Sequence, residues 1–421
     1  MRRNSVETIK TIVIVLLSIS AVLLTLTANL SVDLHTLPGM EALAARFGRT
    51  APLGDTPAAE PESVAAAKPL AISIRNETGR WTAARDFTLL DTAYEALAGY
   101  LGEALGTAET PEALSSGTLR TAMAAQSIYF SYDGMIPLRA LANWLGTDYP
   151  GPEFSANWLM LLLQSDYVQL YFGDGQSQYY CQTQIPSNAI RTQIADYQPD
   201  GSYFAGESNL DAIRQLDAWS LLTPDASLPV CNAEIAMTDA LRTATASALA
   251  FNPYGDGVYT AADGTVVYAE SSCTLQLTPS GTLQLTNADA NRYQLSSQDV
   301  HTQIAYALSL LNSLTATTLG DARLYLTDVH RTDTQTAWTF EYYIGGLPVR
   351  QTSGNGATVV FTGNHLSALT LAVRRYTLTE QTTQLLPVPQ AAAIAPAGAN
   401  LHPEYADTGA AVLQAGWIGG N

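Results

Sequence analysis

The sequence predicts an α+β protein in which a single N-terminal transmembrane helix precedes a multi-domain extracytoplasmic region of helices packed on antiparallel sheets. Three observations lead to this fold class. Residues 11–32 carry no charge over 22 residues, enough for a helix to cross about 30 Å of hydrocarbon. Apolar residues between positions 88 and 105 recur at helical spacing. From residue 257 onward, short runs of alternating apolar and polar residues are separated by turn residues, as in antiparallel strands.

The charges around the apolar run predict its orientation. Arg2, Arg3 and Lys10 precede it, whereas Asp33 and Glu41 follow it. Positively charged flanks stay in the cytoplasm, so residues 1–10 are predicted to be cytoplasmic and the chain after residue 32 extracytoplasmic. A cleaved signal peptide is the alternative, but its apolar region is usually only about 7–15 residues long. The length of residues 11–32 favours a retained signal anchor in the cell membrane.

The composition excludes one class of partner. The 421-residue chain has a net charge of −18. Such a field repels nucleic acid, so the sequence predicts no DNA or RNA binding. Three cysteines, Cys181, Cys231 and Cys273, allow one disulfide at most, so disulfides do not hold the extracytoplasmic region together.

Residues 33–70 are predicted to be an Ala/Pro-rich tether, and residues 71–250 a mixed α/β domain. Residues 88–105 are predicted to be a helix with Thr88 as its N-cap, and Thr110 is predicted to begin a second helix. Two strands are expected at 127–132 and 167–172, with a short helix starting at Pro137.

The rest of the chain is predicted to be richer in strands. Residues 251–297 read as a β-meander, in which the sequence TLQLT appears twice around a Pro-Ser-Gly turn and indicates a hairpin. Residues 298–421 are predicted to be a domain with one helix, 298–317, lying across an antiparallel sheet. Four strand-like runs follow that helix: ARLYLTDVH, AWTFEYYI, GATVVFTG and LSALTLAVRRYTL.

Motifs of catalysis are missing from the sequence. It contains no G-x-S-x-G, no S-x-x-K, no H-E-x-x-H and no phosphate-binding loop, and its five histidines are scattered singly. Asp196, Asp200, Gly201 and Glu207 match four positions of a calcium loop, but Gln198 replaces an expected ligand, which favours a polar turn. The sequence therefore predicts no catalytic, metal-binding or cofactor-binding residues.

The apolar run itself contains a candidate interaction face. Ser18, Ala21, Thr25 and Ala28 are spaced three, four and three residues apart, which places them in one stripe on a helix. In lipid, small residues let two helices approach closely, and hydroxyl groups can bond across the contact. The alternative is that Ser and Thr only bond carbonyl groups of their own helix.

Several segments resemble the YycH family and its relative YycI. They include PLAISIRNETGRWTAARDFTLL, SIYFSYDGMIPLRALANWL, DGTVVYAESSCTLQLTPSGTLQL and FEYYIGGLPVRQTSGNGATVVFTG, of which the GLPV of residues 346–349 is the most recognisable piece. The start of the chain, ETIKTIVIVLLSISAVLLT, also resembles the start of this family.

The resemblance implies a non-enzymatic, membrane-anchored accessory protein of a Gram-positive bacterium. Such proteins bind the sensor histidine kinase WalK (YycG), which controls cell-wall metabolism, and contact its membrane helices. Carried over to this chain, the working face is Ser18, Ala21, Thr25 and Ala28, and the extracytoplasmic region binds a companion YycH- or YycI-like protein. Two alternatives remain: a membrane-tethered protein that binds or assembles envelope components, which requires a ligand-sized cleft, and an extracytoplasmic hydrolase, which requires clustered acids or a Ser/His pair.

Overall fold

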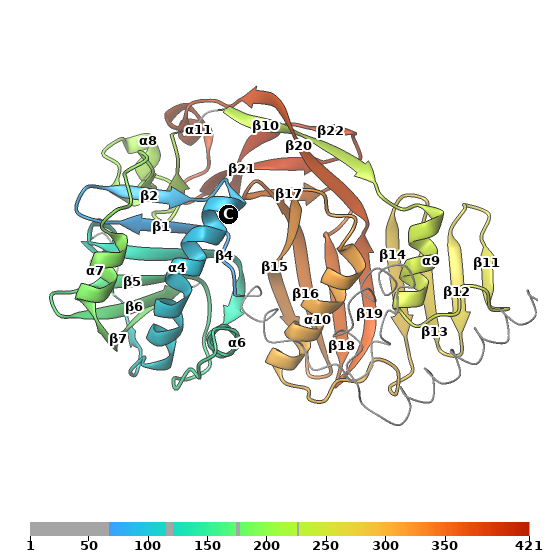
Figure 1. Cartoon of the computed structure of the whole chain (residues 1–421). Coiled ribbons are helices and arrows are strands. Elements are labelled where there is room, and N and C mark those ends of the chain that lie inside the picture. Colours follow the sequence, from blue (N-terminus) through green and yellow to red (C-terminus); the bar gives the residue numbers. More distant parts are fainter. Residues whose placement is uncertain (1–66, 115–120, 174–176, 225–226, 421) are drawn as a thin grey trace, which may run out of the picture. The chain divides into compact units, whose positions relative to one another are not determined.

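The computed structural model of the chain describes residues 67–114, 121–173, 177–224 and 227–420 (Figure 1). It consists mostly of antiparallel sheet, with 43% strand and 23% helix. The predicted α+β class is therefore wrong. Strands dominate because period-two alternation of apolar residues continues through most of the chain after residue 257.

The described helices include none that is both long enough and apolar enough to cross a membrane. Residues 11–32, for which the transmembrane helix was predicted, lie outside the described residues. The longest described helix, α4 (Phe87–Gly106), is amphipathic and buries one face against a sheet. An amphipathic helix of this kind packs its apolar stripe on a core and leaves its polar face outside.

The first sheet has seven antiparallel strands in the order β2-β1-β4-β5-β6-β7-β3. Their bounds are β1 (Ala71–Arg75), β2 (Arg80–Ala83), β3 (Glu112–Ala113), β4 (Ser127–Pro137), β5 (Ser155–Leu163), β6 (Tyr167–Gly173) and β7 (Gln178–Pro186). Three helices pack against it: α4, α6 (Leu138–Trp144) and α7 (Ser187–Ile194). The strands predicted at 127–132 and 167–172 and the helix predicted at Pro137 are confirmed.

Helix α4 begins one residue before the predicted range. Asp86, not Thr88, is the N-cap, because its carboxylate accepts hydrogen bonds from the backbone N–H groups of Thr88 and Leu89. The predicted apolar stripe is confirmed as the buried face: Leu90, Tyr94, Leu97, Leu101 and Leu105.

The second helix predicted at Thr110 does not begin there. Glu112 and Ala113 instead form β3, which pairs with Tyr180 and Tyr179 of β7 at the edge of the sheet. This edge pairing satisfies the backbone without a helix, and local sequence signals do not report it.

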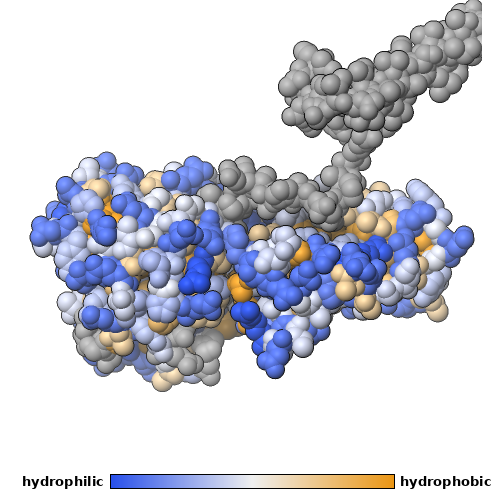
Figure 2. Space-filling view, turned by 90° about the horizontal axis from the view of Figure 1, so that it is seen from below, coloured by the Kyte–Doolittle hydropathy of each residue, from blue (hydrophilic) through white to orange (hydrophobic). Residues whose placement is uncertain are grey.

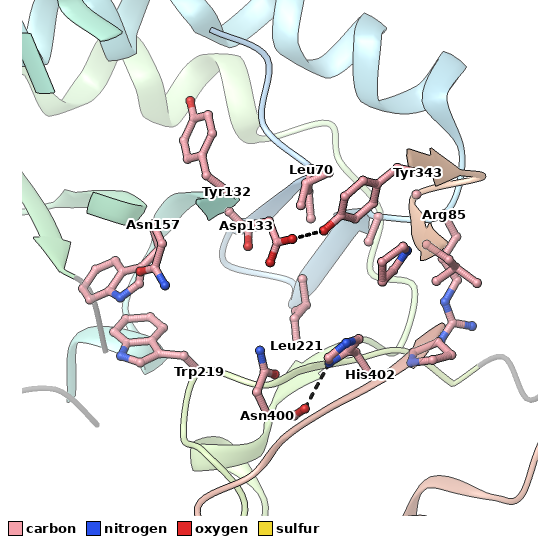
Figure 3. A pocket seen from close by; sticks show the side chains of 18 of the residues that line it. Leu70, Arg85, Tyr132, Asp133, Asn157, Trp219, Leu221, Tyr343, Asn400 and His402 are labelled. Carbon is pink, nitrogen blue, oxygen red and sulfur yellow. Dashed lines mark hydrogen bonds between the residues drawn. The ribbon is translucent and has the colours of Figure 1, made fainter. Parts of the chain in front are cut away.

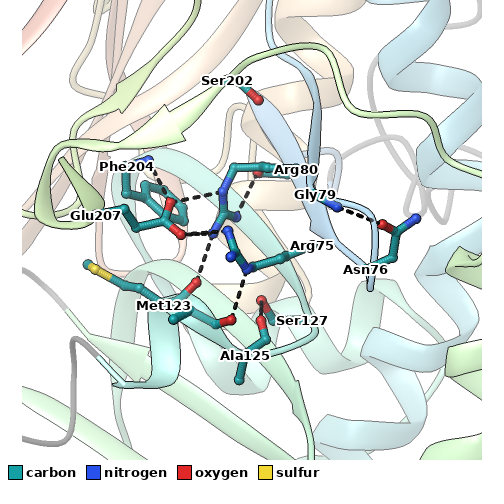
Figure 4. A network of polar contacts seen from close by, with 12 residues as sticks. Arg75, Asn76, Gly79, Arg80, Met123, Ala125, Ser127, Ser202, Phe204 and Glu207 are labelled. Atoms are coloured by element: carbon teal, nitrogen blue, oxygen red, sulfur yellow. Dashed lines mark hydrogen bonds and ion pairs between the residues drawn. The ribbon is translucent and has the colours of Figure 1, made fainter. Parts of the chain in front are cut away.

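The opposite face of the first sheet is covered by a short segment with little regular structure. It contains β8 (Tyr203–Phe204), η2 (Ala205–Glu207), α8 (Asp211–Arg214) and β9 (Leu221–Leu222). Glu207 anchors it, because its carboxylate forms ion pairs with Arg75 at 2.8 Å and with buried Arg80 at 3.1 Å (Figure 4). Glu207 also accepts a hydrogen bond from the backbone N–H of Phe204.

The second sheet has eleven strands, and α10 (Val300–Thr315) lies across it (Figure 1). Its strands are β11 (Val258–Thr260), β12 (Val266–Glu270), β13 (Cys273–Leu277), β14 (Thr282–Asn287), β15 (Ala322–Arg331), β16 (Gln335–Ile344), β17 (Leu347–Gln351), β18 (Ala357–Thr362), β19 (His365–Ala372), β21 (Asn400–Asp407) and β23 (Ala415–Gly420). The hairpin predicted from the repeated TLQLT is confirmed, since Leu275 faces Leu285 and Leu277 faces Leu283.

A small third sheet crosses between distant parts of the chain. It pairs β10 (Ser227–Ile235) with β20 (Arg374–Gln384) and β22 (Val412–Leu413). Helix α9 (Asp239–Ala248) follows β10, and α11 (Val388–Ile394) packs against α8.

The first and second sheets are joined by a shared core and by a salt bridge. Residues of α4, α6 and α10 belong to one continuous hydrophobic cluster. At its border, both guanidinium Nη atoms of Arg323 on β15 donate to the carboxylate of Asp91 on α4, at 2.9 and 2.8 Å. Lys68 also donates to Asp91 at 2.9 Å. Burial raises the pKa of Asp91, but these hydrogen bonds outweigh it and lower the pKa on balance.

The described surface is mostly polar on one side. The face shown in Figure 2 is largely hydrophilic, with apolar residues scattered between polar ones. The three cysteines are free and buried, in keeping with the prediction that disulfides do not hold this region together. Burial raises the pKa of both Cys181 and Cys231 to about 12, which keeps these thiols protonated and unreactive.

Candidate functional site: a cleft between two sheets

A cleft with polar side chains lies where the first sheet meets the β16–β17 hairpin and β21 (Figure 3). Its volume is about 230 Å³. One wall comes from β4, β5 and the segment around β9, and the other from the second sheet. Its lining includes the side chains of Tyr132, Asp133, Asn157, Trp158, Asp217, Trp219, Leu221, Thr223, Tyr343, Arg350, Asn400 and His402.

Asp133 on β4 connects the two walls. Its carboxylate oxygen Oδ2 accepts a hydrogen bond from the hydroxyl of Tyr343 on β16 (Figure 3). The same oxygen accepts another from Arg350 on β17 at 3.1 Å. Burial raises the pKa of Tyr343 well above its usual value, with a further contribution from Asp133, so the hydroxyl remains a donor. A ligand bound in this cleft would therefore contact both sheets next to the bonds that join them.

Arg350 holds a second carboxylate behind the cleft. Its Nε lies 3.7 Å from Glu404 on β21, and Glu404 lies 3.9 Å from His402. Burial raises the pKa of Glu404, whereas His402 and Arg350 lower it. Because Asp133 and Glu404 both pair with Arg350, the protein itself largely neutralises the charge of this guanidinium. Of the two carboxylates, Asp133 lines the cleft.

The β16–β17 hairpin brings Tyr343 and Arg350 to the same place. Ile344 pairs with Leu347, which leaves Gly345 and Gly346 as a two-residue turn. Both glycines have positive φ values, 54° and 77°, as the tight hairpin turn requires. The GLPV segment thus forms the end of this hairpin, and its first three residues line the cleft.

An aromatic cluster forms the other side of the cleft. The rings of Trp158 and Trp219 are 4.2 Å apart between centroids, and Tyr129 stacks on Trp219 at 5.4 Å. Phe204 meets Trp219 edge-on at 5.4 Å. Tyr129 comes from β4, Trp158 from β5, and Phe204 and Trp219 from the segment that covers them, and all four pack in one buried cluster.

Few of the candidate residues predicted from the sequence lie in the part of the chain that the structure describes. Ser18, Ala21, Thr25 and Ala28 lie outside the described residues, so their proposed interaction face stays a prediction. The Glu207 of the calcium-like pattern is held by two arginines. Across the described ranges, no group of three or more His, Cys, Asp or Glu side chains could hold a metal ion.

Sequence reasoning missed the residues that build the cleft. Asp133, Trp219 and His402 come from three separate parts of the chain and belong to no local motif. The sequence signal that could have found them is the resemblance to the YycH family. Its segment SIYFSYDGMIP contains Asp133, and FEYYIGGLPVR contains Tyr343 and Arg350.

In comparisons with protein families, curated proteins and solved structures, this chain matches none of them. The resemblance to the YycH family therefore rests on the quoted segments and stays a prediction.

Glu341 on β16 interacts electrostatically with Arg350, Asp133 and Glu404, and it gives a testable pH dependence of stability. Its side chain is 6% exposed, and burial raises its pKa to about 7. Because the folded state favours the neutral acid, stability is expected to fall as pH rises from the usual glutamate pKa near 4.5 to about 7. Glu341→Gln, which has no charge to bury, should match the wild type at about pH 5 and exceed its stability by about 2–3 kcal/mol at about pH 8.

Urea unfolding of both proteins at the two pH values measures this difference. Asp91 and Asp299 have lowered pKa values and act in the opposite direction, but they are present in both proteins and cancel. An equal gap between wild type and variant at both pH values would show that Glu341 is ionised throughout.

Proposed function

We propose that this chain is a non-enzymatic accessory regulator, held at the cell membrane, that modulates a two-component sensor histidine kinase controlling cell-wall metabolism. The kinase and the membrane location come from the YycH-like segments and from the charge-free residues 11–32. In this proposal, the cleft at Asp133 receives the input.

One observation carries the proposal. Asp133 from one YycH-like segment is bonded by Tyr343 and Arg350 from another, although about 210 residues separate them in the chain. Two segments that resemble the same family thus meet at one cleft. An occupant there contacts both sheets, so its binding can change how firmly they are joined, as a regulatory input requires.

A second candidate function is supported by the cleft alone. A tethered protein that binds or assembles envelope components needs a ligand-sized cavity and no particular interaction face in residues 11–32. The hydrolase alternative needs acids open to a substrate, whereas Asp133 is already bonded by a tyrosine and an arginine.

Co-purification from native membranes tests the regulator proposal. The full chain is compared with a version in which an unrelated apolar segment replaces residues 11–32. We expect a histidine kinase to accompany the first protein and to be lost from the second. Recovery of the same partners with both would favour the binding or assembly function.

A finer version of this test changes Ser18, Ala21, Thr25 and Ala28 to leucine. We expect kinase output to be lost while the folded region keeps its unfolding midpoint. A matched variant with leucine at Ala71 and Ala83, in the buried first sheet, should instead lower that midpoint. Unchanged kinase output in the stripe variant would contradict the predicted interaction face.

A further inference from the structure

A second cavity, of about 250 Å³, lies next to the cleft described above and is lined by α10, β15 and β4. It shares Leu70, Tyr132 and Asp133 with that cleft, and the rest of its lining is different. An engineered cavity of about 150 Å³ lined by apolar side chains stays dry and binds benzene, so this cavity has room for a larger apolar group. Most of the remaining side chains of its lining are apolar: Ile136, Trp144, Ile304, Leu308, Leu319, Leu324 and Leu326.

The polarity of the lining changes along α10. Ile304, Leu308 and Asn312 are each four residues apart, so they lie in one stripe on this helix. Ile304 is fully buried, Leu308 is half-buried and Asn312 is exposed. The cavity is therefore apolar at its inner end and reaches solvent near Asn312.

Two cations lie at the open end of the cavity. Arg323 stands near the start of β15, which follows α10 after a short connection, so it lies at the same end as Asn312. Lys68 is close to Arg323, because both donate to the carboxylate oxygen Oδ1 of Asp91, each at 2.9 Å. The side chains of Lys68 and Arg323 are 26% and 34% exposed, so a ligand can reach both from solvent.

The two cations share a single carboxylate. Asp91 accepts one N–H of Lys68 and two of Arg323, which leaves further donors on both groups. A second carboxylate at this place would complete two ion pairs. Hydrogen bonds between charged partners are stronger than neutral ones, so an anionic head group is favoured over an uncharged one.

The more distant charges do not reverse this preference. Asp133 also lines the cavity, but its carboxylate is bonded by Tyr343 and Arg350. Arg85, which lines the neighbouring cleft, adds a positive charge, and Glu404 beside Arg350 adds a negative one. The net charge of −18 acts weakly at this site, because physiological salt screens charges over about 8 Å.

We propose that this cavity binds the anion of a medium-chain fatty acid. The carboxylate pairs with Lys68 and Arg323 at the open end. The alkyl chain lies along Leu308 toward Ile304, where its burial removes apolar surface of both partners from water. This site is separate from the cleft at Asp133, so the proposal goes beyond the regulatory function and does not rest on it.

Amine labelling of Lys68 tests the proposal. The sequence has only two lysines, Lys10 and Lys68, so the full chain is treated with an acetylating reagent and both are followed by mass spectrometry. Octanoate is expected to slow the labelling of Lys68 saturably, by about threefold to tenfold, and to leave Lys10 unchanged. Hexanoate should require a roughly 10- to 20-fold higher concentration, because each buried methylene contributes about fourfold in affinity.

Two tryptophan substitutions locate the site. Leu308→Trp fills part of the cavity and should weaken the protection by octanoate at least about tenfold. Leu89→Trp is the matched control, because Leu89 is a helical leucine with 49% exposure that does not line the cavity, and it should leave the protection unchanged. Arg323→Gln, which removes a cation, should weaken the protection about threefold to tenfold, and it keeps the test decisive if Leu308→Trp lowers the unfolding midpoint.

Octanol separates the two parts of the proposal. It has the same alkyl chain without the charge, and it should protect Lys68 at least about tenfold more weakly than octanoate. Equal protection by both compounds would overturn the assignment of the carboxylate, and equal losses in Leu308→Trp and Leu89→Trp would overturn the assignment of the cavity. Unchanged labelling of Lys68 at tens of millimolar octanoate would overturn the proposal as a whole. Kinase capture is scored independently, because it concerns residues 11–32 and the other cleft.

Discussion

Arg80→Met is expected to lower the free energy of unfolding by about 3–5 kcal/mol. The Arg80 side chain is almost fully buried, with 1% exposure. It donates to both carboxylate oxygens of Glu207, to the hydroxyl of Ser73 and to the carbonyl of Met123 at distances between 2.9 and 3.2 Å (Figure 4). Burial lowers the pKa of Arg80, and the attraction of Glu207 opposes that shift.

The loss is large because Arg80 satisfies several groups at once. Its guanidinium also lies 4.3 Å from the ring centre of Phe204, which belongs to the aromatic cluster under the cleft. Without Arg80, the partly buried Glu207 keeps Arg75 as its only ion-pair partner among the described residues. An incompletely compensated carboxylate in this position is the main cost.

Urea unfolding monitored by tryptophan fluorescence measures the effect. Arg214→Met is the control, because Arg214 pairs with Asp211 at the surface at 3.9 Å, and it should change stability by at most about 0.5 kcal/mol. In the double variant Arg80→Met with Glu207→Gln, the loss should be smaller than the sum of the single losses, because the two residues interact. Strict additivity would contradict the network.

Gly346→Ala, in the turn of the β16–β17 hairpin at the cleft, is expected to lower the free energy of unfolding by about 2–5 kcal/mol. Gly346 has a φ of +77°, which an alanine adopts only with strain. A Cβ at this position would lie 1.9 Å from the carbonyl oxygen of Ala84, which follows β2. The hairpin or the first sheet must move to relieve this overlap.

Gly146→Ala separates the two contributions. Gly146 has nearly the same φ, +76°, but a Cβ there meets nothing within 4 Å. It should show only the backbone cost, about 1–2 kcal/mol. The difference between the two variants in urea unfolding therefore measures the close approach of the hairpin to Ala84. Equal losses would show that the hairpin does not rest against the first sheet.

Local patterns predicted several individual elements. The stripe of Leu90, Tyr94 and Leu97 predicts α4, and the alternating leucines of TLQLT predict the β13–β14 hairpin. Pro137 precedes α6 as expected, because proline suits the start of a helix. These predictions succeeded because each depends on contacts between residues that are close in the chain.

Predictions failed where a distant pairing overrides the local signal. Thr110 has the features of a helix start, yet Glu112 and Ala113 pair with β7. The strands β8, β9 and β22 escape prediction for a related reason: they have only two residues each and show no periodicity. Their strand geometry depends on a partner strand, which one segment of sequence does not identify.

The cleft is likewise decided by contacts between distant parts of the chain. Composition alone predicts that nucleic acid is not a partner, since charge adds up regardless of fold. Asp133, Trp219, Tyr343 and His402 come together only because β4, β16 and β21 meet where the two sheets adjoin. Hydrophobic periodicity reports which face of an element is buried, whereas the neighbour of that face is selected by packing over long chain separations. For this reason only the folded chain reveals which polar groups share one cavity.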